Sequence, residues 1–162
     1  MNESNFGVNS AGQRELVITR VFDAPRALVW QVWTDPKHIM RWWGPNGFSN
    51  SSCESDLRVG GRFHLNMSAP DGATYPCKGI YREIAEPERI VYESEADESH
   101  PCGAGLPPRS LVTLTFAESD GKTTLTLHTS FESEARRDAA NKAGFSGSWT
   151  ECLERLGEYL NS

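Results

Sequence analysis

The chain has 162 residues, a formal net charge of -6 at pH 7 and 38% hydrophobic residues. This length fits one domain that buries enough apolar surface to fold without disulfides or metal. Basic residues are scattered singly or in pairs, which argues against a nucleic-acid-binding surface and against an anionic-membrane surface, since both need clustered Lys and Arg.

The N-terminal segment is polar and aperiodic, which predicts a flexible leader over 1–13 and a single domain over 14–162. It has neither the basic nor the apolar region of a signal peptide, and no apolar run in the chain approaches the roughly 20 residues that span a bilayer. We therefore expect a soluble, cytoplasmic protein. In that compartment the irregularly spaced cysteines are expected to be free thiols: Cys53, Cys77, Cys102 and Cys152.

The first predicted elements are a strand and two short helices. Residues 15–22 alternate with a period of two in a β-rich run, which predicts a strand. Asp23-Ala24-Pro25 ends this strand and starts a short helix, and Thr34-Asp35-Pro36 repeats the stop-and-start signal. The second helix is predicted over 36–43, where Gly44-Pro45 prevents its continuation.

After Phe48 the period of two returns and turn signals separate the runs. The predicted strands cover 51–58, 62–68, 74–85, 89–94, 109–117 and 122–131. Consecutive strands joined by short turns favour an antiparallel meander with one buried face.

The C-terminal residues change to a helical period. From Ser133 as N-cap, apolar side chains recur every three or four residues up to Leu160, which predicts one long amphipathic helix. Gly144 and Gly147 weaken that helix and suggest a close approach to the sheet or room for a ligand. The order of elements predicts an α+β fold in which a curved antiparallel sheet of about six to seven strands wraps around this helix.

A series of motifs runs in order along the chain: Thr19-Arg20-Val21-Phe22-Asp23-Ala24-Pro25, Trp33-Thr34-Asp35-Pro36, Arg41-Trp42-Trp43-Gly44-Pro45, Asp56-Leu57-Arg58-Val59-Gly60-Gly61, Pro70-Asp71-Gly72 and Gly79-Ile80-Tyr81-Arg82-Glu83. With these motifs the chain resembles the C-terminal-domain-like family of activators of the 90-kDa heat-shock protein ATPase, within the START-like, helix-grip superfamily. The resemblance implies a deep cavity between the sheet and the long helix. It supplies no common catalytic set.

Aromatic and aliphatic side chains are the candidate walls of that cavity. Trp33 and Trp149 face the sheet by helical periodicity, whereas adjacent Trp42 and Trp43 point about 100° apart, so that one packs while the other lines the cavity mouth. The alternative for each is a purely structural place in the core. The candidate ligand-binding residues are Trp33, Trp42, Trp43, Phe63, Leu65, Tyr81, Tyr92, Leu114, Leu127 and Trp149.

Polar candidates for chemistry are few. Asp56, Glu83, His64 and His128 are the candidates for proton transfer, but strand parity places both histidines opposite to the inward side chains, and each carboxylate has an arginine nearby. No His or Cys spacing suits a metal, and no Ser lies in a nucleophile motif. We predict no catalytic residue, no metal and no cofactor.

The expected function is non-enzymatic binding of a small apolar or amphipathic ligand, as a carrier or sensor. One alternative is a co-chaperone-like domain that acts on a 90-kDa heat-shock-type chaperone in the stress response, although the leader is too short for the N-terminal domain of the eukaryotic activators. A second alternative is an enzyme like the polyketide cyclases or dehydratases. The long segment 96–108, with Leu106, is a candidate lid. No oligomeric state follows from the sequence.

Overall fold

A computed structural model describes the backbone of residues 6–9 and all of residues 14–95 and 110–161. Within these ranges one antiparallel sheet of eight strands is accompanied by four helices. The strands are β1 (Phe6–Asn9), β2 (Glu15–Phe22), β3 (Ser49–Ser55), β4 (Arg62–Ser68), β5 (Thr74–Ala85), β6 (Arg89–Ser94), β7 (Leu111–Ser119) and β8 (Lys122–Ser130). The helices are α1 (Arg26–Thr34), α2 (Pro36–Trp42), α3 (Glu134–Lys142) and α4 (Phe145–Leu160).

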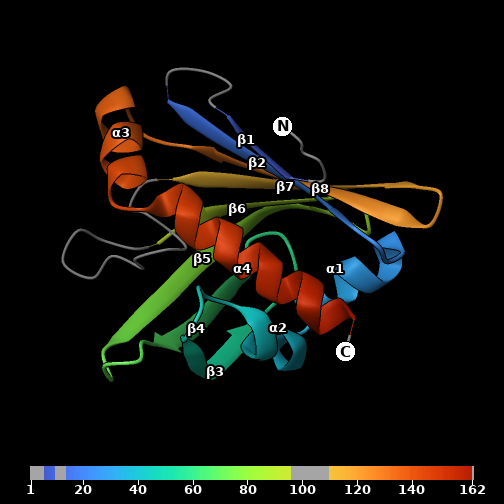
Figure 1. Cartoon of the computed structure of the whole chain (residues 1–162), viewed down its shortest axis with the longest axis horizontal. Helices are drawn as coiled ribbons and strands as arrows, with labels where there is room; N and C mark the ends of the chain where they lie inside the picture. The colour runs from blue at the N-terminus through green and yellow to red at the C-terminus, as the bar shows by residue number, and fades with distance from the viewer. Residues whose placement is uncertain (1–5, 10–13, 96–109, 162) are drawn as a thin grey trace.

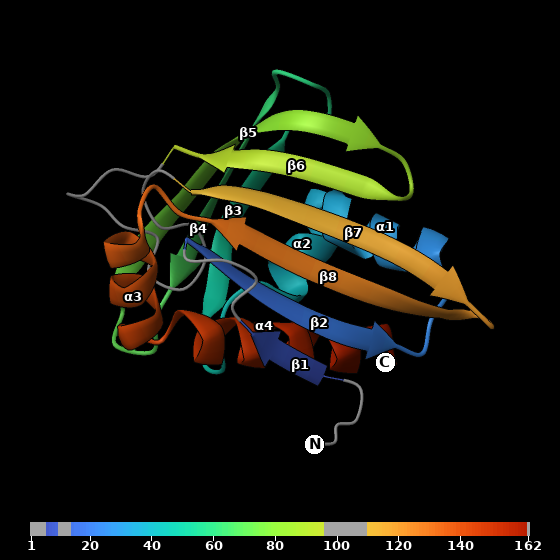
Figure 2. The ribbon, with the colours of Figure 1, turned by 90° about the horizontal axis from the view of Figure 1, so that it is seen from above.

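The sheet has the order β1-β2-β8-β7-β6-β5-β4-β3, so that the predicted meander from β3 to β8 closes against the first strands. The sheet curves around α4, which crosses its concave side (Figures 1 and 2). On the same side, α2 packs against β3, and α1 packs against β7 and β8. The predicted α+β helix-grip fold is confirmed. The eighth strand, β1, lies inside the segment 1–13 expected as a leader and pairs with β2.

Alternation of side chains gives the sheet its buried face. In β4 and β8 every second side chain is buried, as a sheet packed on one side requires. Register shifts between Tyr81 and Glu83 in β5, and between Asn50 and Ser52 in β3, insert extra residues that bend the strands. The resulting concave face holds one continuous hydrophobic core with the inward faces of α1, α2 and α4.

The C-terminal helix departs from the prediction of a single element. α3 and α4 are separated at Gly144, whose φ of +99° is a left-handed conformation that favours glycine. α3 buries none of its side chains, whereas α4 buries an apolar stripe. The break therefore lets α4 follow the core while α3 remains at the surface.

Of the two alternatives suggested for Gly144 and Gly147, the close approach to the sheet occurs at Gly157 instead, and neither residue lines the cavity described below. A Cβ added at either of the first two residues would meet nothing within 4 Å. A Cβ at Gly157 would lie 3.1 Å from the Arg20 guanidinium and 3.5 Å from the Phe22 ring. Gly157 thus permits the contact between α4 and β2.

Two further expectations concern the membrane and the cysteines. No helix in the described ranges is long and apolar enough to cross a membrane. Cys53 and Cys152 are free thiols, but Cys77, on β5, is disulfide-bonded, so the expectation of free thiols does not hold there. Cys102 and the candidate lid at 96–108 lie outside the described residues.

Candidate ligand-binding cavity

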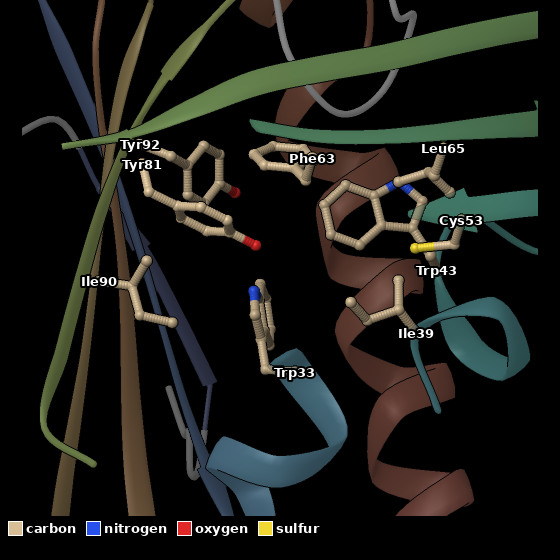
Figure 3. Close-up of a pocket in the computed structure, with 9 residues that line it drawn as sticks. All are labelled: Trp33, Ile39, Trp43, Cys53, Phe63, Leu65, Tyr81, Ile90 and Tyr92. Carbon is tan, nitrogen blue, oxygen red and sulfur yellow. The ribbon is translucent and has the colours of Figure 1, made fainter. Parts of the chain in front are cut away.

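A small hollow lies on the concave face of the sheet, beneath the two short helices (Figure 3). Strands β3 to β6 form one wall, and α1 and α2, together with the residue that follows α2, form the other. The lining is almost entirely apolar and consists of Trp33, Ile39, Trp43, Cys53, Phe63, Leu65, Tyr81, Ile90 and Tyr92.

The hollow is nearly filled in this conformation. The space open to the centre of a water-sized sphere is about 20 Å³. One water molecule needs roughly 10–15 Å³ by the same measure, whereas sites for drug-sized ligands span about 300–1,000 Å³. The cavity as described therefore has room for about one water molecule, and a larger guest requires its walls to move apart.

The sheet side of the cavity follows from strand pairing. Tyr81 of β5 and Tyr92 of β6 are register partners, so that their side chains lie next to each other. Phe63 of β4 contacts both phenol rings, with centroids 5.4 Å from Tyr81 and 5.0 Å from Tyr92. The ring of Phe63 lies over Gly79, where an added Cβ would come within 2.5 Å of it. Gly79 thus sets the depth of this wall.

Four tryptophans form the helix side and the layer behind it. Trp33 stacks on Trp149 with ring centroids 6.1 Å apart, and Trp43 meets Trp149 edge to face at 5.3 Å. Trp42 is fully buried, contacts Trp33 at 4.7 Å and donates its indole N–H to the Val32 carbonyl at 2.9 Å. Only Trp33 and Trp43 of these four line the cavity, and α4 contributes none of the lining residues.

The position of the cavity is therefore not the expected one. The cavity lies between the sheet and the α1–α2 pair, because Trp33 and Trp43 stand between it and Trp149 of α4. Six of the ten candidate residues line it, namely Trp33, Trp43, Phe63, Leu65, Tyr81 and Tyr92. The other four, Trp42, Leu114, Leu127 and Trp149, are buried in the core outside its lining.

Three lining residues were absent from the candidate set: Ile39, Cys53 and Ile90. Ile90 has the inward parity of Tyr92 on β6, a signal that the sequence contains. Ile39 is the buried residue of α2 that lies one helical turn before Trp43. Cys53 lies on β3, whose burial is too sparse for its inward face to be recognised from the sequence.

The titratable groups of the cavity are two phenols and one thiol. The Tyr81 hydroxyl lies 2.8 Å from the Ser55 hydroxyl, whereas the buried Tyr92 hydroxyl has no hydrogen-bond partner among the described residues. Burial raises the pKa of Tyr81 to about 12 and raises the pKa of Tyr92 still further. Burial, aided by Glu54 and Asp35, raises the pKa of Cys53 to about 11. All three groups are therefore neutral at physiological pH.

The C-terminal end of α2, which places Trp43, is held from two sides. Asn50 of β3 donates its side-chain amide to the carbonyls of Met40 at 3.1 Å and Trp43 at 3.0 Å. From α4, one guanidinium nitrogen of Arg155 lies 3.3, 2.9 and 3.0 Å from the carbonyls of Trp43, Gly44 and Pro45. These contacts satisfy backbone oxygens that a helix end leaves without partners.

The acid–base candidates lie outside the cavity. Asp56 pairs with Arg58 at 2.7 Å and Glu83 with Arg89 at 3.1 Å, and all four side chains are largely exposed. His64 is exposed, and His128 lies 3.4 Å from Glu15 on the neighbouring strand. Across the described ranges, no group of three or more His, Cys, Asp or Glu side chains could hold a metal ion.

Comparison with known proteins places this architecture in a family. The sequence model described as "Activator of Hsp90 ATPase homolog 1-like protein" matches residues 23–161. No curated protein matches the chain.

Solved structures share the fold over nearly the whole chain. A crystal structure of a Nitrosomonas europaea protein is 25% identical, covers 93% of this chain and 96% of its own, and has a TM-score of 0.82. A Mycobacterium smegmatis crystal structure is 26% identical, covers 96% of each chain and has a TM-score of 0.82. A solution structure of an AHSA1-like protein from Aeromonas hydrophila is 23% identical, covers 90% and 92% and has a TM-score of 0.67. The chain belongs to the family of activator of Hsp90 ATPase homolog 1-like proteins.

Proposed function

We propose that this protein binds a small apolar or amphipathic molecule in the cavity beneath α1 and α2, as a carrier or sensor. Family membership supports a ligand-binding or a co-chaperone-like domain. The observation that favours ligand binding is the hollow itself, which lies inside the core and is walled by aromatic rings from separate elements. Such an apolar hollow with a few polar atoms is the common form of a small-molecule site.

Binding on this scheme requires the cavity to expand. The helix wall is the part suited to move, because α2 has only seven residues and β3 is an edge strand with few buried side chains. Cys53, half-buried on β3, lies where these two elements meet. A ligand that separates α2 from β3 would enlarge the space between Trp43 and the tyrosines, and it would have to break the Asn50 hydrogen bonds to the end of α2.

A titration with p-xylene tests the proposal. Binding is monitored by the NMR signals of the indole N–H groups of Trp33 and Trp43. Saturable shifts centred on these two signals are expected. Cys53→Leu should weaken binding more than tenfold, because its longer side chain fills a space that holds about one water molecule. Cys53→Ser, which has nearly the original size, is the matched control. Absence of saturable shifts, or equal binding by the leucine variant, would reject the proposal.

Docking on a 90-kDa heat-shock-type chaperone is the second candidate function, and family membership favours it. The chaperone's ATPase rate, measured with and without this protein, separates the two candidates. On the ligand-binding proposal the rate does not change, and the Cys53→Leu variant behaves like the parent protein. Stimulation of the ATPase that survives this substitution would assign the function to another surface.

An enzymatic role has less support from the cavity. Its lining includes no His, Asp or Glu, and its titratable groups are Cys53, Tyr81 and Tyr92 with raised pKa values. General acid–base catalysis works best with a pKa near the working pH.

The cytoplasmic location expected from the sequence is also a proposal, and the disulfide at Cys77 would be uncommon in a reducing compartment.

A further inference from the structure

The hydroxyl of Tyr92 is an unusual polar atom in this apolar cavity. Its residue is 2% exposed, and the hydroxyl has no hydrogen-bond partner within the part of the chain that the structure describes. Figure 3 shows the phenol projecting from β6 into the cavity, beside that of Tyr81. Buried hydroxyls are normally hydrogen-bonded, so one that lines a cavity calls for an explanation.

The surroundings of Tyr92 leave the hydroxyl available. Phe63 packs edge to face against the phenol, with planes at 85°, and offers no conventional acceptor. The neighbouring hydroxyl of Tyr81 lies 2.8 Å from Ser55, which occupies part of its bonding capacity. The indole nitrogen of Trp33 faces the side of the cavity where both phenol oxygens lie (Figure 3). A guest between these groups would meet polar atoms at one end and apolar side chains elsewhere.

Phenylalanine would fill the same space without a buried hydroxyl. An unpaired buried hydroxyl costs free energy that a phenyl ring avoids. Its presence at position 92 therefore suggests that it hydrogen-bonds a molecule other than this chain. Because burial raises the pKa of Tyr92 well above its usual range, the oxygen keeps its proton and can donate it.

We infer that the Tyr92 hydroxyl is the polar anchor of the cavity and hydrogen-bonds a neutral oxygen, a hydroxyl or carbonyl, of a compact ligand. The inference rests on the proposed function, because it names the ligand class of the same site. The oxygen is neutral because no cationic side chain lines the cavity, and a buried charge without a partner is strongly disfavoured. The ligand is compact because the space open to the centre of a water-sized sphere is only about 20 Å³.

A pair of probes with nearly the same shape tests this inference: p-cresol, which carries one hydroxyl, and p-xylene, which has a methyl group in its place. The dissociation constants are measured by NMR titration of the parent protein, Tyr92→Phe and Tyr81→Phe. The parent should bind p-cresol about tenfold more tightly than p-xylene, the effect of one net hydrogen bond. In Tyr92→Phe this ratio should fall to one or below, because the p-cresol hydroxyl is then buried without the Tyr92 partner, and p-xylene affinity should change less than about twofold. Tyr81→Phe, the matched control, should keep the preference.

The possible outcomes distinguish this inference from the proposed function. If p-xylene binds but p-cresol binds no better, the anchor is rejected and the proposed function stands; a permanently bound water on the Tyr92 hydroxyl would give this result. A preference that survives Tyr92→Phe also rejects the anchor. If neither probe binds the folded parent protein, the proposed function is rejected together with the anchor. Dispersed amide spectra verify that each variant is folded.

Discussion

The contact between Arg155 and the end of α2 gives a sharp prediction about stability. Arg155→Met removes a guanidinium nitrogen that lies 2.9 and 3.0 Å from the carbonyls of Gly44 and Pro45, with a longer contact to Trp43. This nitrogen carries two hydrogens and can therefore donate two hydrogen bonds, both of which the substitution removes. Methionine keeps most of the apolar stem, so the change concerns mainly these bonds.

The expected loss is about 2–3 kcal/mol of unfolding free energy. A hydrogen bond to a charged group contributes roughly 1.5–3 kcal/mol, and the partial exposure of Arg155 lowers the sum for two. Urea unfolding followed by tryptophan fluorescence measures the loss, which should appear as a lower midpoint at an unchanged slope. For a chain of this size the melting temperature should fall by about 5–10 °C.

Arg58→Met is the matched control for this prediction. The Arg58 side chain is 72% exposed and pairs with Asp56 at the surface, so its removal should change the unfolding free energy by less than about 0.5 kcal/mol. If Arg155→Met cost no more than this control, the guanidinium would not hold the α2 end, and our account of how Trp43 is positioned would be wrong.

Three further predictions follow from the cavity walls and the terminal helix. Gly79→Ala should lower the unfolding free energy by about 1–3 kcal/mol in urea titrations and weaken p-xylene binding, because the new methyl group pushes the Phe63 ring into the cavity; unchanged stability and binding would contradict the proposed depth of this wall. Gly147→Ala should instead raise the unfolding free energy by up to about 1 kcal/mol in the same assay, because alanine favours the helix and its Cβ would meet nothing within 4 Å. A loss of stability would contradict this geometry. Stability should also fall as pH rises from about 10 to about 12, because the unfolded chain loses the Tyr81 proton at about pH 10 while the folded chain retains it up to about 12; Tyr81→Phe should reduce this fall, and an identical pH profile would refute the shift.

Much of the fold could be predicted because its signals are local. The period of two in 62–68 and 122–131, and the turns between strands, depend on side-chain alternation and backbone chemistry that each segment carries by itself. The order of the elements added the wrapping of the sheet around the terminal helix, and the motif series added the family. The same local logic misjudged the helix break, since Gly144 lies within a helical period and only its left-handed conformation separates α3 from α4.

The candidate site was less predictable, because lining a cavity is a property of several elements together. Periodicity identified Trp33, Phe63 and Tyr92 as inward-facing, but Trp149 and Leu114 have the same inward parity and are packed into the core. The pattern of a single strand or helix does not determine which inward side chains contact one another and which leave a gap between them.

The sequence by itself determined the class of fold, the apolar character of the interior and the family, since these follow from patterning and motifs along the chain. Only the tertiary structure decided that the cavity lies under α1 and α2, that it has room for about one water molecule, and that the Tyr92 hydroxyl faces it without a partner in the described chain. The physical reason is that these properties depend on how closely side chains from distant segments pack, and such packing is set by three-dimensional shape.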